Sequence, residues 1–104
     1  MNHETSARNI HRRGSGCASA VYTAFKDVNR NVSFPPSARS EGGKCGAVLA
    51  AEKVLRETGT GKIEEFEQRF IELFGTLKCS ELLQTSFSCN DFVGKAAAIA
   101  DELM

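Results

Sequence analysis

The sequence lacks the long apolar runs, the excess of one charge and the export signal that define several common classes of protein. Its longest apolar stretches, at 46–51 and 96–100, fall far short of the roughly 20 residues that a membrane-spanning helix needs. Basic and acidic side chains balance at thirteen each, so the sequence predicts neither nucleic-acid binding nor attraction to acidic lipid. No long apolar segment of an export signal follows Arg12 and Arg13. We therefore expect a cytoplasmic protein that does not insert into membranes.

Cysteine is too sparse for a scaffold held together by disulfides. Four cysteines among 104 residues, without an export signal, favour thiols that bind a metal or exchange electrons. The shortest gap, from Cys79 to Cys89, contains nine residues, whereas structural zinc sites place paired ligands only about two to four residues apart. The Cys-x-x-Cys pair of thioredoxin-like proteins is also missing. Zinc is thus disfavoured, and dithiol chemistry would need cysteines that the fold brings together.

The clearest feature that the sequence does contain is helical periodicity. Apolar side chains recur at three- and four-residue spacing in the segments 5–13, 17–29, 44–57, 60–74 and 90–103. Residues 30–44 contain both prolines and several serines and glycines, so we expect a loop there. The sequence predicts one all-α domain over residues 1–104, a small single-domain bundle of four to five helices, with residues 1–4 disordered.

Each of the four cysteines lies at or just before a predicted helix start. They are Cys17, Cys45, Cys79 and Cys89, the last two directly before the expected helix caps Ser80 and Asn90. The free amides and partial positive charge of a helix start stabilise an anion, so we expect lowered thiol pKa values and a working site made of these residues. The alternative is that the cysteines pack as small hydrophobic side chains.

Four converging thiolates would suit an iron–sulfur cluster. A two-iron cluster on four thiolates carries about two negative charges when oxidised, and four helix starts at roughly +0.5 each would offset about that much. A [2Fe–2S] cluster is therefore favoured over [4Fe–4S], with zinc or no metal as alternatives. Without metal, Cys79 and Cys89 could form a disulfide that closes a loop of about ten residues. His11 lies six residues before Cys17, and we expect it in solvent, the alternative being that it approaches the site as an extra ligand or proton donor.

The segments around the cysteines resemble a known family. They are Gly16-Cys17-Ala18-Ser19-Ala20-Val21, Gly42-Gly43-Lys44-Cys45-Gly46-Ala47-Val48 and Phe74-Gly75-Thr76-Leu77-Lys78-Cys79-Ser80-Glu81-Leu82, with Cys89 last. In this order they resemble the four-cysteine GCAxxG family of bacterial proteins over residues 5–103, although the family's final glycine is Ala50 here. The resemblance implies a helical fold and a redox role.

The expected function is that of a small redox-active or electron-transfer protein whose four cysteines hold an iron–sulfur cluster. The alternatives are a metal-free thiol–disulfide redox protein and a helical binding module with structural or zinc-bound cysteines. The expected partner is another redox protein, and association into a homodimer remains open. The residues expected to bind both the cofactor and its metal are Cys17, Cys45, Cys79 and Cys89.

Overall fold

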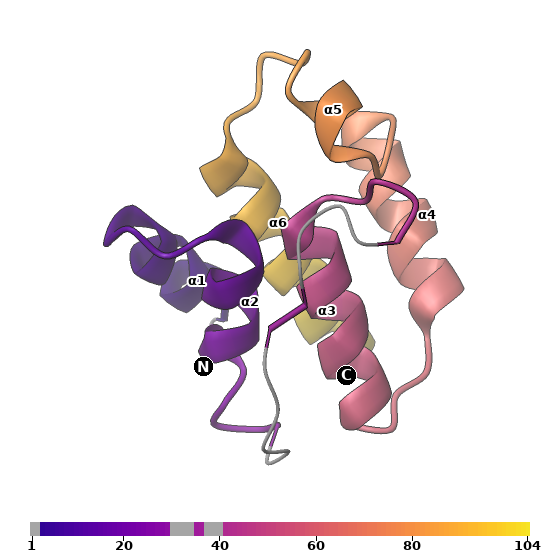
Figure 1. The fold of residues 1–104 in the computed structure, drawn as a ribbon. Helices are drawn as coiled ribbons and strands as arrows, with labels where there is room; N and C mark the ends of the chain where they lie inside the picture. The colour runs from indigo at the N-terminus through magenta and orange to yellow at the C-terminus, as the bar shows by residue number, and fades with distance from the viewer. Residues whose placement is uncertain (1–2, 30–34, 37–40) are drawn as a thin grey trace.

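The computed structural model describes residues 3–29, 35–36 and 41–104, which form six α-helices (Figure 1). These are α1 (His3–Arg12), α2 (Cys17–Ala24), α3 (Gly46–Glu57), α4 (Ile63–Phe74), α5 (Cys79–Leu82) and α6 (Cys89–Leu103). Within the described residues there is no strand, and the β pairing is a single isolated bridge. The all-α class is confirmed. The described residues contain six helices where four to five were predicted. The additional one is the four-residue α5, where the sequence predicted a short turn capped by Ser80 and the structure has Lys78 at the N-cap.

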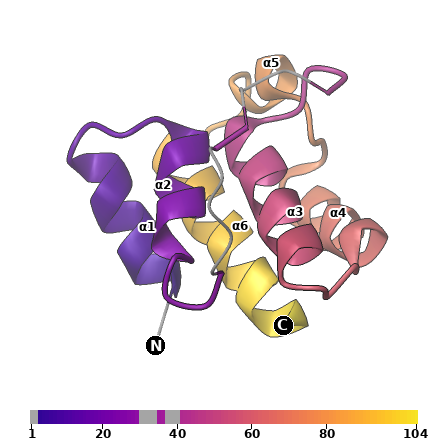
Figure 2. The ribbon, with the colours of Figure 1, turned by 60° about the horizontal axis from the view of Figure 1, so that its bottom comes forward.

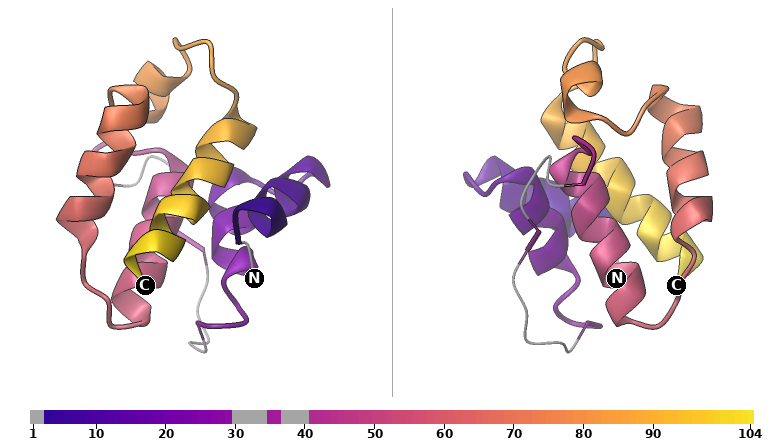
Figure 3. Two further views of the ribbon diagram at one scale, coloured as in Figure 1. Left: turned by 180° about the vertical axis from the view of Figure 1, so that it is seen from behind. Right: turned by 45° about the vertical axis from the view of Figure 1, so that its right-hand side comes forward.

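Helices α3 and α6 form the centre of the molecule. The longest helix, α6, packs against α1, α2, α3 and α4, and α3 also packs against α2 and α4. Figures 2 and 3 show the result from other sides, with α1 and α2 on one flank of this centre and α4 on the other. Helices α2, α3 and α6 all begin at the end of the molecule where α5 lies. None of the described helices has the length and apolar character that crossing a bilayer requires.

Small side chains allow the central helices to approach one another closely. The core contains fully buried alanines on α2, α3 and α6, namely Ala20, Ala47, Ala50, Ala51, Ala96, Ala97 and Ala100. Ala50, where the resembling family has glycine, is 0% exposed and packs in this core without difficulty. Larger apolar side chains fill the remaining space between the helices: Tyr22, Phe25, Phe66, Phe70 and Phe92.

The bounds of the first two helices, and of the loop expected after them, differ from the prediction. Helix α1 begins at His3, so His3 and Glu4 are helical where disorder was expected, and residues 1–2 lie outside the described part. Of the expected loop at 30–44, residues 30–34 and 37–40 also lie outside it, whereas 41–43 form a turn. Helix α2 ends at Ala24, before the predicted end at 29, because the following residues make turns.

Candidate functional site

The starts of four helices position the four cysteines, as the sequence predicted. Cys17, Cys79 and Cys89 are the first residues of α2, α5 and α6, and Cys45 occupies the N-cap position of α3. The caps themselves differ from the prediction. Ser88, not Asn90, caps α6, where it accepts a hydrogen bond from the Asp91 amide in a capping box.

A short backbone pairing holds Cys45 and Cys79 side by side. Lys44 and Lys78 form the isolated antiparallel bridge, and each is followed directly by a cysteine. The amide of Cys45 donates to the Leu77 carbonyl at 2.8 Å, and the amide of Cys79 donates to the Gly43 carbonyl at 2.9 Å. Gly43 has a φ of 81°, a conformation that glycine adopts without strain. Two cysteines 34 positions apart in the sequence are thus tied together through their backbones.

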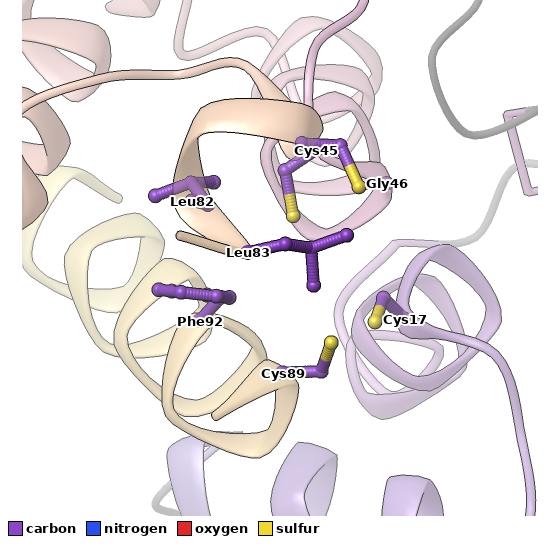
Figure 4. A pocket seen from close by; sticks show the side chains of 8 residues that line it. Cys17, Cys45, Gly46, Leu82, Leu83, Cys89 and Phe92 are labelled. Carbon is purple, nitrogen blue, oxygen red and sulfur yellow. The ribbon is translucent and has the colours of Figure 1, made fainter. Parts of the chain in front are cut away.

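All four cysteines line one half-open pocket of about 340 Å³ (Figure 4). Cys45 is only 4% exposed, whereas Cys17, Cys79 and Cys89 are half-buried. In Figure 4, Leu82 and Phe92 form one wall, and the labelled cysteines extend towards the centre from α2, α3 and α6. The predicted convergence of the four thiols at one place in the fold is therefore present.

Burial and crowding control the protonation of these thiols. Burial raises the pKa of Cys17 to about 12, and the three neighbouring cysteines add to the rise. Burial likewise raises the pKa of Cys45, although the amides of Ala47 and Val48 at the start of α3 act against it. The expectation that helix starts would lower the thiol pKa is wrong for these two residues, because desolvation outweighs the helix field. A thiol with a raised pKa ionises more readily where a cation compensates the charge, and binding of a metal to such a thiol would release a proton.

The four cysteines are free thiols, and Cys17 and Cys89 lie close enough for Cys89 to help raise the Cys17 pKa. This is a different pair from Cys79 and Cys89, whose short separation in sequence suggested a disulfide. Among residues 3–29, 35–36 and 41–104, no three histidine, cysteine or acidic side chains are grouped closely enough to hold one metal ion. The four thiols therefore line the pocket without converging on a single metal-binding position.

Two polar residues other than the cysteines lie near Cys17: His11 contacts its sulfur, and Asn90 contacts His11. The Nε2 atom of His11, expected in solvent, is 3.7 Å from the Cys17 sulfur and is half-buried. Its Nδ1 atom is 3.1 Å from the side-chain amide of Asn90, the residue after Cys89. Sequence reasoning assigned Asn90 to a helix cap because that role is local, whereas its contact with His11 joins residues 79 positions apart. The one available signal was the proximity of His11 to Cys17 in sequence.

Lys44, although adjacent to Cys45, points away from the thiols. Its Nζ atom is 2.6 Å from Glu67 Oε2 and 3.4 Å from Glu52 Oε1. This ion pair ties the bridge segment to α3 and α4. Lys44 therefore anchors the backbone that carries Cys45 and is not a charge partner of the thiol.

Comparisons of the chain with models of known protein families, with curated proteins and with solved structures found no match. The fold and the pocket define it as an all-helical protein with four thiols gathered at the starts of its helices.

Proposed function

We propose that this chain is a small redox-active or electron-transfer protein that binds an iron–sulfur cluster through Cys17, Cys45, Cys79 and Cys89. The observation that carries the proposal is that these four cysteines, from four different helix starts, line one pocket. A cluster held by four cysteine thiolates, when bound, supplies electron transfer over a wide range of potentials.

The size of the pocket supports a cluster over a single ion. A water molecule needs roughly 10–15 Å³ of such space, and the half-open pocket that the four cysteines line together with apolar residues has a volume of about 340 Å³. A single zinc ion would require the four sulfurs to approach one centre at about 2.3 Å each. No three of these thiols are grouped closely enough for a single ion, which favours a larger inorganic group in the pocket. We propose a [2Fe–2S] cluster, with [4Fe–4S] as the larger alternative.

The positive charge at the helix starts also supports an anionic cluster, although three helices contribute to it and not four. Helices α2, α3 and α6 have eight, twelve and fifteen residues and present a partial positive charge of about 0.5 each. The α5 turn has four residues, too few for a comparable field. The three longer helices therefore offset about 1.5 charges. Leu82 and Phe92 keep one wall apolar, which strengthens these interactions.

Partial exposure of the thiols suits exchange of electrons with another protein. Cys17, Cys79 and Cys89 are half-buried and not sealed in the core. Leu83, on the rim of the pocket, is 55% exposed and offers an apolar contact beside them. Another redox protein is the partner that we propose, and a second copy of this chain is the alternative.

Metal and sulfide analysis tests the proposal. Protein produced with ample iron and purified without oxygen should be brown, with iron and acid-labile sulfide in near-equal amounts. Serine at any one of the four cysteine positions should weaken or bleach the visible bands. Ser80→Ala, an exposed change next to Cys79, is the matched control and should keep them. A colourless protein with stoichiometric zinc, or with no metal after anaerobic reconstitution, would overturn the proposal.

Thiol–disulfide exchange is the second candidate, and we assign it to Cys17 and Cys89, which line the same pocket and interact with each other. In this reaction the two thiols lose two electrons and two protons to the disulfide of a partner, which is reduced to two thiols as the new S–S bond forms. Metal-free protein in a graded glutathione buffer should show a reversible loss of two hydrogens by mass spectrometry. Peptide mapping should find Cys17 joined to Cys89. Four thiols that stay reduced throughout would exclude this reaction.

A further inference from the structure

Beside the cysteine pocket, Arg8 of α1 and Asn90 of α6 hold each other in one orientation. The Arg8 guanidinium donates to the Asn90 side-chain oxygen at 3.2 Å and to its main-chain carbonyl at 3.3 Å. In return, the side-chain amide of Asn90 donates to the Arg8 carbonyl at 3.1 Å. If the Asn90 amide were rotated by 180°, its NH₂ group would face the Arg8 guanidinium, donor against donor. Its oxygen would then face the Arg8 carbonyl, acceptor against acceptor. The nitrogen of the Asn90 side chain is therefore fixed on the side of His11.

This orientation determines which nitrogen of His11 carries the proton. Asn90 Nδ2 is a donor, and it lies 3.1 Å from His11 Nδ1, so Nδ1 accepts. The neutral ring then has its hydrogen on Nε2, which is the atom 3.7 Å from the Cys17 sulfur. Arg8 and His11 are three residues apart on α1 and so share the face that meets the first turn of α6.

We propose that His11, fixed by Asn90 as an Nε2–H donor, is a positioning residue that gives the Cys17 sulfur a hydrogen bond and favours the reduced state of the site. This inference rests on the proposed redox function. Hydrogen bonds to cluster sulfurs tune the reduction potential, and a donor stabilises the more negative, reduced state. For a disulfide the sign is the same at a pH high enough to ionise Cys17, because a donor to the thiolate stabilises the reduced form.

The same residue types occur as a Cys-His-Asn triad in cysteine hydrolases, but the polarity here is opposite. In a triad the histidine accepts the proton of the nucleophile, and the third residue holds the ring in the tautomer that can do so. Here Asn90 donates to the ring, and the ring nitrogen that faces Cys17 already carries hydrogen. A neutral His11 cannot act as a base towards Cys17 in this arrangement, which argues for a tuning role and against nucleophilic catalysis.

Nitrogen NMR of the His11 ring, on metal-free reduced protein at alkaline pH where an imidazole is neutral, tests the tautomer directly. The wild type should carry hydrogen on Nε2. Asn90→Asp keeps an acceptor for Arg8 but replaces the amide donor with a second acceptor, so the hydrogen should move to Nδ1. A wild-type ring with hydrogen on Nδ1, or a ring that Asn90→Asp leaves unchanged, would overturn the proposal.

The reduction potential of the anaerobically reconstituted protein provides the second readout. His11→Leu removes the donor and should lower the equilibrium constant for reduction about tenfold, which is about 59 mV for a one-electron couple. His11→Gln retains an amide donor and should stay within about threefold of wild type. Asn90→Asp in the His11→Leu protein measures the effect of the added charge alone. Equal shifts for His11→Leu and His11→Gln would overturn the proposal.

The two readouts separate this inference from the proposed function. If the wild type takes up no cluster, the cluster proposal fails, and the potential of the Cys17–Cys89 disulfide, measured in glutathione buffers, replaces that of the cluster. If a cluster forms but neither the ring tautomer nor the potential responds to these substitutions, the His11 inference fails alone.

Discussion

The guanidinium of Arg8 in α1 lies against the backbone of Gly94 in α6, where a side chain at position 94 would begin. A Cβ atom on Gly94 would overlap the Nε and Cζ atoms of Arg8. The absence of a side chain lets Arg8 reach the first turn of α6, where it contacts Asn90 and Asp91. Glu4 holds the other side of the guanidinium, with oxygen–nitrogen distances of 3.0 and 3.2 Å. The absence of a side chain at Gly94 thus lets Arg8 pack between α1 and α6 and contact Asn90, the residue after Cys89.

Gly94→Ala should displace Arg8 and lower the free energy of unfolding by about 1–3 kcal/mol, the usual cost of overpacking. In an Arg8→Ala background the clash is absent, and alanine's better helix propensity should make the same change neutral or stabilising by up to about 1 kcal/mol. Denaturant unfolding of the wild type, both single variants and the double variant measures the difference. Equal losses in the two backgrounds would mean that Arg8 is not the group displaced.

A second prediction concerns the glycine that supports the Lys44–Lys78 bridge. Gly43 has a φ of 81°, and its carbonyl accepts the Cys79 amide. Gly43→Ala meets no neighbouring atom, so its direct cost is the left-handed backbone alone, about 1–2 kcal/mol. Because that strain falls on the bridge, the variant should also retain less iron and sulfide after gel filtration. Reconstituted protein analysed for both elements measures this loss.

Gly59 provides the matched control for this experiment. It has a φ of 79° and equally open surroundings, but it lies after the C-terminal end of α3, away from the pocket. Gly59→Ala should cost a similar free energy of unfolding and leave the iron content unchanged. If both variants lose iron equally, global stability and not the bridge controls retention.

Local features of the fold were predictable from sequence, and those that depend on distant contacts were not. Cysteines at helix starts could be placed because the apolar period and the glycines that end helices are local signals. Ser80 and Asn90 were assigned as caps because serine and asparagine cap helices in general, yet Ser88 has the role at α6. Three to four residue periodicity also does not reveal which thiols are buried, so the direction of the Cys17 pKa shift needed the assembled pocket.

A third prediction concerns His3, which joins the start of α1 to the end of α6. Its Nδ1 atom is 2.5 Å from Asp101, its Nε2 atom is 2.9 Å from Asp27, and its ring stacks on Phe25. Burial opposes the charged ring, but hydrogen bonds to the two carboxylates outweigh it and raise the His3 pKa. The stabilisation is therefore complete below about pH 6.5 and is lost as pH rises through the higher value of the folded state.

His3→Gln should lower the free energy of unfolding by about 1.5–3 kcal/mol near pH 6, the range for hydrogen bonds to charged groups. The loss should shrink as the pH is raised. The same contact lowers the Asp27 pKa, so its contribution also declines as pH falls through the acid range. Arg12→Gln, an exposed charge change on the same helix, is the control. A loss that does not vary with pH would assign the effect to packing on Phe25 alone.

The last prediction concerns Glu52, whose carboxyl is completely buried in α3. Its Oε2 atom faces no hydrogen-bond donor, and its Oε1 atom is 3.4 Å from Lys44 Nζ. Burial raises the Glu52 pKa to about 8, a hydrogen bond with Glu67 adds to the rise, and Lys44 acts against it. The same interaction lowers the Glu67 pKa, so Glu52 is the member of the pair that holds the proton.

The folded protein therefore holds one proton that the unfolded chain has released between about pH 4.5 and pH 8. Stability should fall as pH rises across that interval, at up to about 1.4 kcal/mol per pH unit. Glu52→Gln keeps the donor and cannot ionise, so it should remove this slope and exceed the wild type in stability at about pH 9. Because the His3 slope has the same sign, the two variants must be compared separately and combined. Glu64→Gln, an exposed change on α4, is the control. An unchanged slope in Glu52→Gln would mean that Glu52 is ionised in the folded protein, with Lys44 compensating its charge.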